Sequence, residues 1–401
     1  MKRQALGIYI HIPFCLRKCP YCDFYSIHNH DRELRERFIN ALCKEIKYYG
    51  QRYGKKYGVN TIYFGGGTPT ILQPWEIGKI LEQVKESFWV VKGAEISLEC
   101  NPATANAEKM RGYWNLGIRR LSIGAQSFDN KVLKTLGRLH TSDDVRRTMD
   151  YAFKGGFRNI SLDLMFGIPG QTFTSWIDTV RAAMNVNPQH ISLYSLEFME
   201  DTWFWKWREQ GKMKETSAED DRVMYEYAIK IMAEKGFEQY EISNVAKGER
   251  YRSRHNLKYW ELEDYLGFGP SAHSFTDNVR HSNVSWLEFY LDAIEKQNLD
   301  KDIFIGTTNA YGTGAVDGFV KNSYRDNVAD YIFTGLRKNE GLNLAKFRSR
   351  FDRDIWDIYD EDCRRRFDAF VKDGFAKADD ENIRLTLKGM NVSNRIMSLF
   401  V

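Results

Sequence analysis

Two hydrophobic patterns alternate along the first half of the chain. Short apolar runs bounded by glycine, proline or polar residues are typical of buried strands, whereas longer segments with apolar residues three and four positions apart are typical of helices. The runs predict strands at residues 7–12, 59–64, 95–99, 119–123, 159–165 and 190–196. The longer segments predict helices at residues 31–49, 75–88, 107–116, 143–154 and 172–185. The chain therefore begins with repeated strand–helix units.

Strands that alternate with helices favour a parallel sheet with right-handed crossovers. Six such units predict a partial, open (βα)6 barrel rather than a closed barrel of eight. Functional groups in such barrels lie at the carboxyl ends of the strands. The expected fold class is therefore α/β, with any chemistry placed where the strands end.

The second half of the chain follows a different pattern. We place a domain boundary between residues 202 and 203, which separates a barrel, 1–202, from a C-terminal region, 203–401. The tail predicts helices and one hairpin, at residues 328–336, 365–372, 379–382 (the hairpin) and 386–399. Helices followed by a small hairpin suggest an α+β, winged-helix-like module. Because its charge bias is weak, a docking or lid role is favoured over DNA binding.

Composition limits the classes of protein that the chain can belong to. Its 401 residues are enough for two domains, and the formal charge of +4 is too small to indicate a nucleic-acid partner. No apolar run is long enough to cross a membrane. The apolar stretch behind the basic start is broken by His11 and Pro13, and it lacks the cleavage site of a signal peptide. We therefore expect a cytoplasmic protein.

Three cysteines follow the first predicted strand with the spacing C-x3-C-x2-C: Cys15, Cys19 and Cys22. A loop this tight can bring three thiolates onto one iron–sulfur cluster. A [4Fe–4S] cluster usually takes four protein thiolates, so three would leave one iron open for a small molecule. The other cysteines are scattered and are expected to be ordinary buried thiols, namely Cys43, Cys100 and Cys363.

Two other uses of these cysteines compete with a cluster. His28 and His30 lie close enough in sequence to complete a zinc site, and this alternative stays open because the spacing of zinc ligands is variable. A disulfide would leave one thiol over, and it does not suit a chain without a secretory signal.

Polar and glycine residues mark the ends of the following strands. The glycine run 65–67 follows the second strand, where the backbone can approach a ligand closely and aim N–H groups at it. Asp163 lies inside an apolar strand, and a carboxylate in such a strand needs a partner. Glu99, Gln126 and Arg138 end or follow the third and fourth strands. Each of these residues alone is explained equally well as a strand-end group bonded to the backbone.

The cysteine spacing resembles that of the radical S-adenosylmethionine (SAM) superfamily, in which the open iron binds SAM. The whole chain resembles the family of oxygen-independent coproporphyrinogen III dehydrogenases, and within it the haem chaperone branch, with matching runs at 7–26, 65–70, 124–128 and 163–170. The resemblance implies that Cys15, Cys19 and Cys22 hold the cluster. It also implies a SAM site lined by Tyr9, Tyr21, Gly66, Gly67, Thr68, Glu99, Gln126, Arg138 and Asp163.

Two features favour the chaperone branch over the dehydrogenases. The dehydrogenases carry a fourth cysteine where this chain has Phe24, which puts the decarboxylation of coproporphyrinogen in doubt. The stretch 255–260 is similar to the H-N-x-x-Y-W stretch of the haem chaperones, and imidazoles ligate haem iron while aromatic rings pack on porphyrins. The resemblance implies haem contacts from His255, Tyr259 and Trp260. His273 is a second candidate, whereas structural roles are expected for His11, His140 and His190.

Two functions therefore remain in view. The first is a haem carrier that delivers haem to apoproteins, with the cluster and SAM in an accessory role. The alternative is a radical SAM oxidoreductase that acts on coproporphyrinogen III or another tetrapyrrole, so whether the chain is an enzyme stays open. The expected partners are haem, recipient apoproteins that include membrane-bound respiratory enzymes, and an electron donor to the cluster. Self-association into a homodimer is left open.

Overall fold

The computed structural model describes residues 3–28 and 30–401. The chain forms two compact units, and each is built from two separate stretches. The first unit comprises residues 1–224 and 264–321, and the second comprises 225–263 and 322–401. The boundary expected between residues 202 and 203 does not coincide with this division, because residues 264–321 add strands to the sheet of the first unit.

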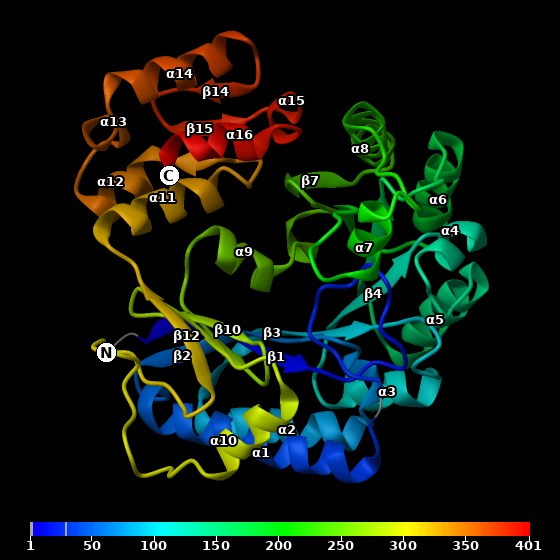
Figure 1. Ribbon diagram of the computed structural model, residues 1–401, viewed down its shortest axis with the longest axis vertical. Helices are drawn as coiled ribbons and strands as arrows, with labels where there is room; N and C mark the ends of the chain where they lie inside the picture. Colours follow the sequence, from blue (N-terminus) through cyan, green and yellow to red (C-terminus); the bar gives the residue numbers. More distant parts are fainter. Residues whose placement is uncertain (1–2, 29) are drawn as a thin grey trace. The chain divides into compact units, whose positions relative to one another are not determined.

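Six parallel strands form the centre of the first unit and neighbour one another in sequence order (Figure 1). They are β1 (Gln4–Ile12), β2 (Tyr57–Gly66), β3 (Trp89–Cys100), β4 (Arg120–Gln126), β5 (Asn159–Phe166) and β6 (His190–Ser195). The helices between them are α1 (Arg32–Tyr53), α2 (Pro74–Ser87), α3 (Ala107–Asn115), α5 (Ser142–Gly155) and α6 (Phe173–Asn185). The six strands expected of the α/β barrel, and the five helices expected between them, are therefore confirmed. The short helices η1 (Pro69–Ile71), α4 (Asn130–Thr135) and α7 (Trp203–Glu209) were not expected.

Short polar side chains fix where the barrel helices begin. Asp31 accepts a hydrogen bond from the Leu34 N–H at the start of α1, and Thr141 forms a reciprocal capping box with Asp144 at the start of α5. Such caps satisfy backbone N–H groups that have no partner inside the helix. At the other end of α5, Gly156 adopts a left-handed conformation with φ of 114°, which ends the helix cleanly. The predicted helix boundaries consequently agree with the structure to within a few residues.

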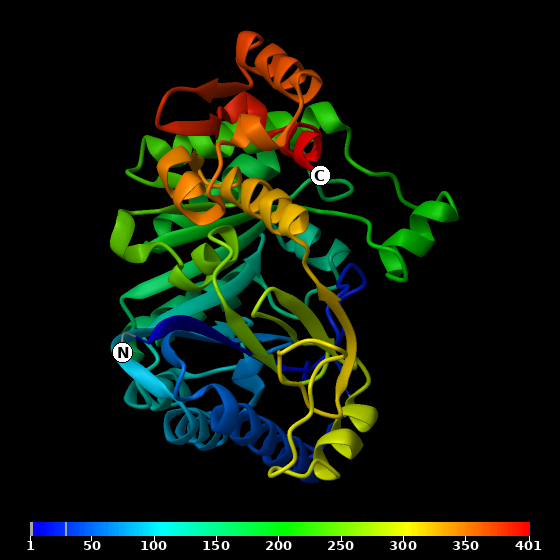
Figure 2. The ribbon, with the colours of Figure 1, turned by 90° about the vertical axis from the view of Figure 1, so that its left-hand side faces the viewer.

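Four further strands extend the sheet beyond β1. They are β9 (Tyr265–Phe268), β10 (His273–Thr276), β11 (Val279–Asn283) and β12 (Val316–Lys321), and α10 (Leu287–Glu295) lies between the last two in sequence. β9 runs parallel to β1, whereas β10, β11 and β12 follow as antiparallel neighbours. Figures 1 and 2 show α1, α2 and α10 on one side of this part of the sheet.

A buried carboxylate connects this extension to the barrel. Glu45, on α1, is fully buried and accepts hydrogen bonds from the Gly269 N–H at 2.9 Å, from the Asn283 side-chain amide at 2.7 Å and from the Tyr290 hydroxyl at 2.7 Å. Burial raises the pKa of Glu45 to about 7. One side chain thus joins α1 to a strand connection, to β11 and to α10.

The second unit combines helices with two small groups of strands. Its first stretch contains most of α8 (Ala218–Ala233), followed by β7 (Glu238–Glu241), β8 (Asn244–Ala246), η2 (Glu249–Tyr251) and α9 (Arg254–Trp260). Its second stretch begins with α11 (Tyr324–Gly335), β13 (Leu342–Asn343), α12 (Leu344–Phe351), α13 (Ile355–Ile358) and α14 (Glu361–Lys372). It ends with β14 (Ala376–Ala378), β15 (Asn382–Leu385), α15 (Leu387–Met390), α16 (Ser393–Met397) and η3 (Ser398–Phe400).

The tail has the expected winged-helix-like character. Its helices pack on the antiparallel sheet β13–β15–β14 around a core that includes Ile332, Phe347 and Phe367. The single helix expected at 386–399 is wrong, because the helical backbone is interrupted at Val392, where φ is −124° and ψ is 26°. No helix in the described part of the chain has the length and apolar character needed to cross a membrane.

Candidate cluster and cofactor site

The three motif cysteines lie in one loop, residues 13–28, which we call the cysteine loop. Its two ends are held together where the Cys15 N–H donates to the Ile27 carbonyl at 2.8 Å and the Ile27 N–H donates to the Pro13 carbonyl at 2.7 Å. Inside the loop, the Cys22 N–H donates to the Cys19 carbonyl at 3.1 Å. All three cysteines are free and partly buried. The loop therefore presents three unpaired thiols directly after β1.

A hydrogen-bonded network joins two of these cysteines through the ends of neighbouring strands. The Cys15 sulfur lies 3.5 Å from the Thr68 hydroxyl, which accepts a hydrogen bond from the Asn101 side-chain amide at 2.6 Å. The Asn101 oxygen in turn accepts from Arg138 at 2.5 Å, and another nitrogen of the same guanidinium donates to the Cys19 sulfur at 3.6 Å. Arg138 also donates to the Gly124 carbonyl at 2.8 Å, while its Nε is buried without a hydrogen-bond partner. Thr68 therefore lies beside Cys15, and Arg138 lies beside Cys19.

The sequence led us to expect that the N–H groups of the glycine loop point at a ligand. In the structure they are instead hydrogen-bonded within the protein. The Gly66 N–H donates to Glu99 at 3.2 Å, and the Gly67 and Thr68 N–H groups donate to the Ile12 and Phe14 carbonyls at 2.9 and 2.7 Å. A Cβ at position 67 would approach the Phe14 carbonyl oxygen to 2.7 Å. The glycines therefore allow the loop to pack tightly against the backbone that leads into the cysteine loop.

Glu99 belongs to a polar group inside the barrel. It accepts a hydrogen bond from the Tyr63 hydroxyl at 2.8 Å, and the Tyr63 ring stacks on Tyr9 with centroids 6.2 Å apart. Burial raises the pKa of Glu99 to about 7, and the nearby Asp163 adds to the rise. This carboxyl can therefore change its charge near neutral pH.

Asp163, on β5, faces a group of serines. The Ser122 hydroxyl donates to it at 3.1 Å, and the Ser161 hydroxyl lies 3.5 Å from the same carboxylate. Burial raises the pKa of Asp163, and the serine hydroxyls oppose that rise. The buried carboxylate thus has the partners that its place in an apolar strand requires.

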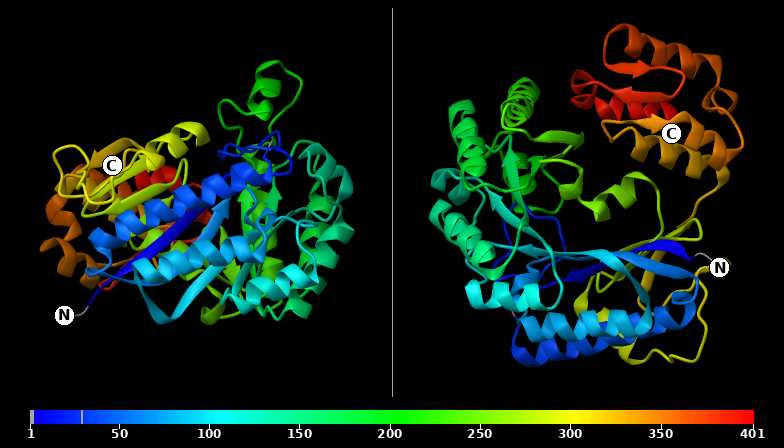
Figure 3. Two further views of the ribbon diagram at one scale, coloured as in Figure 1. Left: turned by 90° about the horizontal axis from the view of Figure 1, so that it is seen from below. Right: turned by 180° about the vertical axis from the view of Figure 1, so that it is seen from behind.

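Gln126 and Tyr21 also belong to the residues that the resemblance implies for the SAM site. Gln126 has a left-handed backbone with φ of 63°, and a Cβ on Gly124 would lie 3.1 Å from its side-chain nitrogen and 3.5 Å from the Arg138 guanidinium. Tyr21 packs edge-on against Phe204 of α7, with centroids 6.1 Å apart. The Phe204 N–H also donates to the Pro20 carbonyl at 3.2 Å, so α7 lies beside the cysteine loop (Figure 3, left).

The donor set is the type that an iron–sulfur cluster takes, because the loop holds three free thiols. Burial raises the pKa of Cys22 to about 12 and also raises that of Cys15, so these thiols keep their protons unless a positively charged centre draws them off. Among the described residues, no three His, Cys, Asp or Glu side chains surround the position of a single metal ion. Cys100 and Cys363 are buried as expected, whereas Cys43 is only partly buried.

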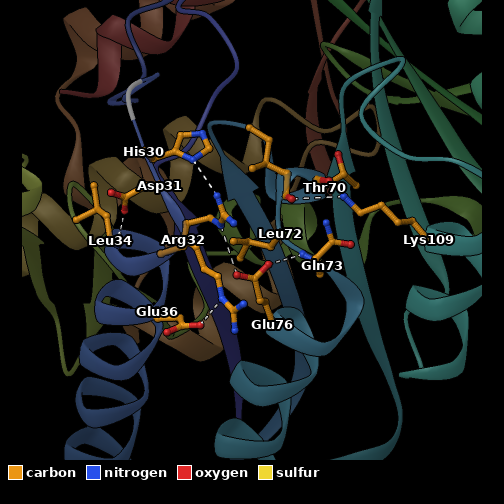
Figure 4. Close-up of polar contacts among 12 residues, drawn as sticks. His30, Asp31, Arg32, Leu34, Glu36, Thr70, Leu72, Gln73, Glu76 and Lys109 are labelled. Atoms are coloured by element: carbon orange, nitrogen blue, oxygen red, sulfur yellow. Dashed lines mark hydrogen bonds and ion pairs between the residues drawn. The ribbon is translucent and has the colours of Figure 1, made fainter.

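One histidine considered for zinc is held by another partner. Arg35 lies 3.4 Å from the His30 ring nitrogen and 3.5 Å from the Glu76 carboxylate, so it connects the segment after the cysteine loop to α2. Figure 4 labels His30 and Glu76. In the same view, Lys109 donates to the Thr70 carbonyl at 2.6 Å. These contacts support the segment that follows the glycine loop.

The residues expected to contact haem lie in the second unit. His255 is buried, its Nε2 lies 2.8 Å from the Tyr259 hydroxyl, and burial lowers its pKa to about 3. The guanidinium of Arg337 lies 4.3 Å from the centre of the Trp260 ring. Both rings therefore have partners within their own unit. His273, the second candidate, is exposed at the start of β10.

The three histidines expected to be structural are all buried and hydrogen-bonded. His11 contacts the Tyr25 carbonyl at 2.9 Å, His140 contacts the Ala125 carbonyl at 3.1 Å, and His190 contacts the Ser161 hydroxyl at 2.7 Å. This expectation is confirmed.

Sequence reasoning missed two residues of the site. Asn101 connects Thr68 to Arg138, and Tyr63 holds Glu99. Asn101 follows Glu99 by two positions at the end of β3, so its place beyond a strand end was the available signal. Tyr63 lies inside an apolar run and offered none.

Comparison with known proteins agrees with this geometry. Residues 9–183 match the model of the radical SAM superfamily, and residues 323–392 match that of the HemN C-terminal domain. The chain is 32% identical to the haem chaperone HemW of Bacillus subtilis over 98% of both chains. It is 35% identical to HemW of Escherichia coli over 68% of this chain and 71% of that one. Coproporphyrinogen III oxidase (HemN) from E. coli has a similar fold, with a TM-score of 0.83 at 22% identity, covering 99% of this chain and 90% of that one.

The strand–helix barrel with its three-cysteine loop defines a radical SAM protein. Within that superfamily, this chain belongs to the family of HemW and HemN proteins. Membership of the superfamily implies a [4Fe–4S] cluster and SAM.

Proposed function

We propose that this protein is a haem chaperone that binds haem and delivers it to apoproteins. The observation that carries the proposal is its similarity to HemW of B. subtilis along 98% of both chains. Phe24 adds support, since it stands where the dehydrogenases carry a fourth cysteine. Conversion of a porphyrinogen is the competing function and would be revealed by the test below.

Cys15, Cys19 and Cys22 would hold the cluster in this proposal. Tyr9, Tyr21, Gly66, Gly67, Thr68, Glu99, Gln126, Arg138 and Asp163 would line the SAM site. A reduced cluster held by these cysteines would supply the electron needed to cleave a C–S bond of SAM. Arg138 has a buried Nε without a partner, which suits it to receive an anionic group. Glu99 and Asp163 offer carboxylates for the cationic and hydroxyl groups of SAM.

The haem contacts proposed for His255, Tyr259 and Trp260 would require His255 to leave its bond to Tyr259. The C-terminal region, with its winged-helix-like module, would serve in docking. We place the protein in the cytoplasm, where it would meet recipient apoproteins, membrane-bound respiratory enzymes among them, and an electron donor to its cluster. A homodimer is compatible with this role, and no nucleic-acid partner is expected.

The decisive experiment uses one anaerobically reconstituted sample. Haem titration, SAM cleavage and the conversion of coproporphyrinogen III are measured on that sample. We expect stoichiometric haem binding without porphyrinogen conversion. Conversion at enzymatic rates in the absence of stable haem binding would return the protein to the oxidoreductase class.

A further inference from the structure

A haem-binding surface needs three kinds of group. An imidazole must reach the iron, apolar faces must cover the macrocycle, and cations must meet the propionates. Only two of the eight histidines are exposed in the structure, His28 and His273. His255 and four others are buried, and His30 contacts Arg35. The accessible imidazoles therefore lie outside the H-N-x-x-Y-W stretch.

His28 lies at the closing end of the cysteine loop, next to apolar side chains. Phe14 and Ile27 form a parallel bridge, so the strand-like segment that enters the loop runs alongside the one that leaves it. Continued by one residue, this pairing places Cys15 opposite His28, and Leu16 is the next residue along the chain. The Leu16 side chain is 60% exposed although it is apolar. An exposed imidazole and an exposed aliphatic side chain thus belong to the same loop.

Aromatic residues continue this surface. Phe24 is 61% exposed, and the hydroxyl of its neighbour Tyr25 accepts a hydrogen bond from the Leu287 N–H at 2.8 Å. Trp286 precedes Leu287 and is 69% exposed. Large exposed aromatic side chains that gather in one place mark an interaction site. The residue that replaces the fourth cysteine of the dehydrogenases is therefore one of two exposed aromatic residues that adjoin the Tyr25–Leu287 contact in sequence.

Two cationic side chains of the cysteine loop supply the third kind of group that a haem-binding surface needs. Arg17 and Lys18 lie between the first two cysteines, and both are exposed. Neither takes part in an ion pair within the described residues, whereas the exposed Arg32 pairs with Glu36. Their charges are available for a carboxylate ligand.

We propose that the outer surface of the cysteine loop is a haem seat, with His28 as the axial ligand, Leu16, Phe24 and Trp286 against the macrocycle, and Arg17 and Lys18 toward the propionates. This inference rests on the proposed haem-carrier function and specifies its site. This placement replaces the haem contacts of His255, Tyr259 and Trp260 given above, and His255, which contacts the Tyr259 hydroxyl, then has a structural role. Phe24 serves haem binding where a dehydrogenase has a thiol.

The test compares His28→Gly with His273→Gly, which removes the other exposed imidazole. Ferric haem is added anaerobically to cluster-loaded full-length protein, and the electron paramagnetic resonance of the haem is recorded, since the optical band of the cluster overlaps the Soret region. We expect His28→Gly to lose the wild-type axial signature and added imidazole to restore it, while His273→Gly matches the wild type. Iron and sulfide content of each variant reports whether the loop still folds.

A charge test addresses the propionates separately. Arg17→Glu combined with Lys18→Glu is expected to weaken haem binding by about two- to tenfold without altering the axial signature, because each exposed ion pair contributes little. If wild-type protein binds haem and His28→Gly keeps the wild-type signature, the seat is placed wrongly while the carrier function stands. If the axial signature is lost in His255→Ala or in His273→Gly but kept in His28→Gly, the seat is likewise placed wrongly while the carrier function stands. Failure of the wild type to bind haem overturns the carrier function itself.

Discussion

The guanidinium of Arg138 lies 3.6 Å from the sulfur of Cys19 and hydrogen-bonds Asn101 on its other side. A cation is thus fixed beside a cluster cysteine by groups from two other strand ends. We expect Arg138→Ala to weaken SAM binding by roughly tenfold to a hundredfold, since the loss of a charge-assisted contact costs about 1.5–3 kcal/mol. Calorimetry on cluster-loaded protein measures this change.

Arg138→Lys is the matched variant. It keeps the charge but loses the planar fork that reaches Asn101, Gly124 and Cys19 together. Its SAM affinity should lie between those of the wild type and Arg138→Ala. Wild-type affinity in both variants would remove Arg138 from the SAM site.

The cysteines divide into two sets of three. Cys15→Ser, Cys19→Ser and Cys22→Ser should each abolish the oxygen-sensitive [4Fe–4S] cluster, because the loop supplies only these thiols. The control variants Cys43→Ser, Cys100→Ser and Cys363→Ser should keep it, since they lie outside the loop. Iron and sulfide analysis after anaerobic reconstitution decides the matter, and a full cluster in Cys19→Ser would contradict the assignment.

The barrel was predictable because residues close together in the sequence determine each of its strands and helices. Each of its strands is a short apolar run and each helix begins at a polar cap such as Asp31 or Thr141, so neighbouring residues determine both. The extension β9–β12 was not predictable in the same way. Its strands are four to six residues long, and they depend on partners more than 240 positions away, as in the pairing of β9 with β1 and the contact of Glu45 with Tyr290.

The candidate site was predictable only as a set of positions. The spacing of the cysteines and the strand-end placement of Thr68 and Arg138 identified residues that the structure brings together. Sequence gave no sign that the glycine-loop N–H groups are taken up by Glu99 and by the backbone before the cysteine loop. It also gave no sign that His255 is buried against Tyr259, because burial arises from tertiary packing.

SAM binding should depend on pH through Glu99. Burial raises the pKa of this carboxyl to about 7, so it is largely neutral at pH 6 and largely ionised at pH 7.5. If the ionised carboxylate receives a cationic group of SAM, affinity should rise roughly five- to tenfold between these two values. Glu99→Gln should bind SAM more weakly and with no such rise. A wild-type affinity that is flat or falls with pH would exclude this role for Glu99.

Stability should depend on pH through Glu45. Its folded pKa of about 7 lies above the ordinary value of 4.5, so the folded protein holds this proton more tightly than the unfolded chain does. The stabilising contribution is complete below about pH 4.5 and is lost as the pH rises through about 7. Glu45→Ala removes the acceptor of three hydrogen bonds and should lower the free energy of unfolding by about 1–3 kcal/mol at pH 7.5.

Denaturant titration of the cluster-free protein at several pH values measures both effects of Glu45. Glu45→Gln is the control for charge, since it cannot titrate, and the fall in stability between about pH 4.5 and 7 should be smaller in this variant than in the wild type. An equal fall in both proteins would assign the pH dependence to other groups.

His255→Ala separates a structural role from an iron-binding one. The variant removes a buried ring and leaves the Tyr259 hydroxyl without its partner at 2.8 Å, so the second unit should lose about 1–3 kcal/mol of stability. The cluster should survive, because Cys15, Cys19 and Cys22 belong to the first unit. With haem seated on the cysteine loop, the axial signature of ferric haem should also survive, and coproporphyrinogen III should remain unconverted.

Tyr259→Phe, which removes only the hydroxyl, should reproduce part of the stability loss. A changed axial signature in His255→Ala, with Tyr259→Phe unaffected, would instead make His255 the iron ligand and require α9 to open when haem binds.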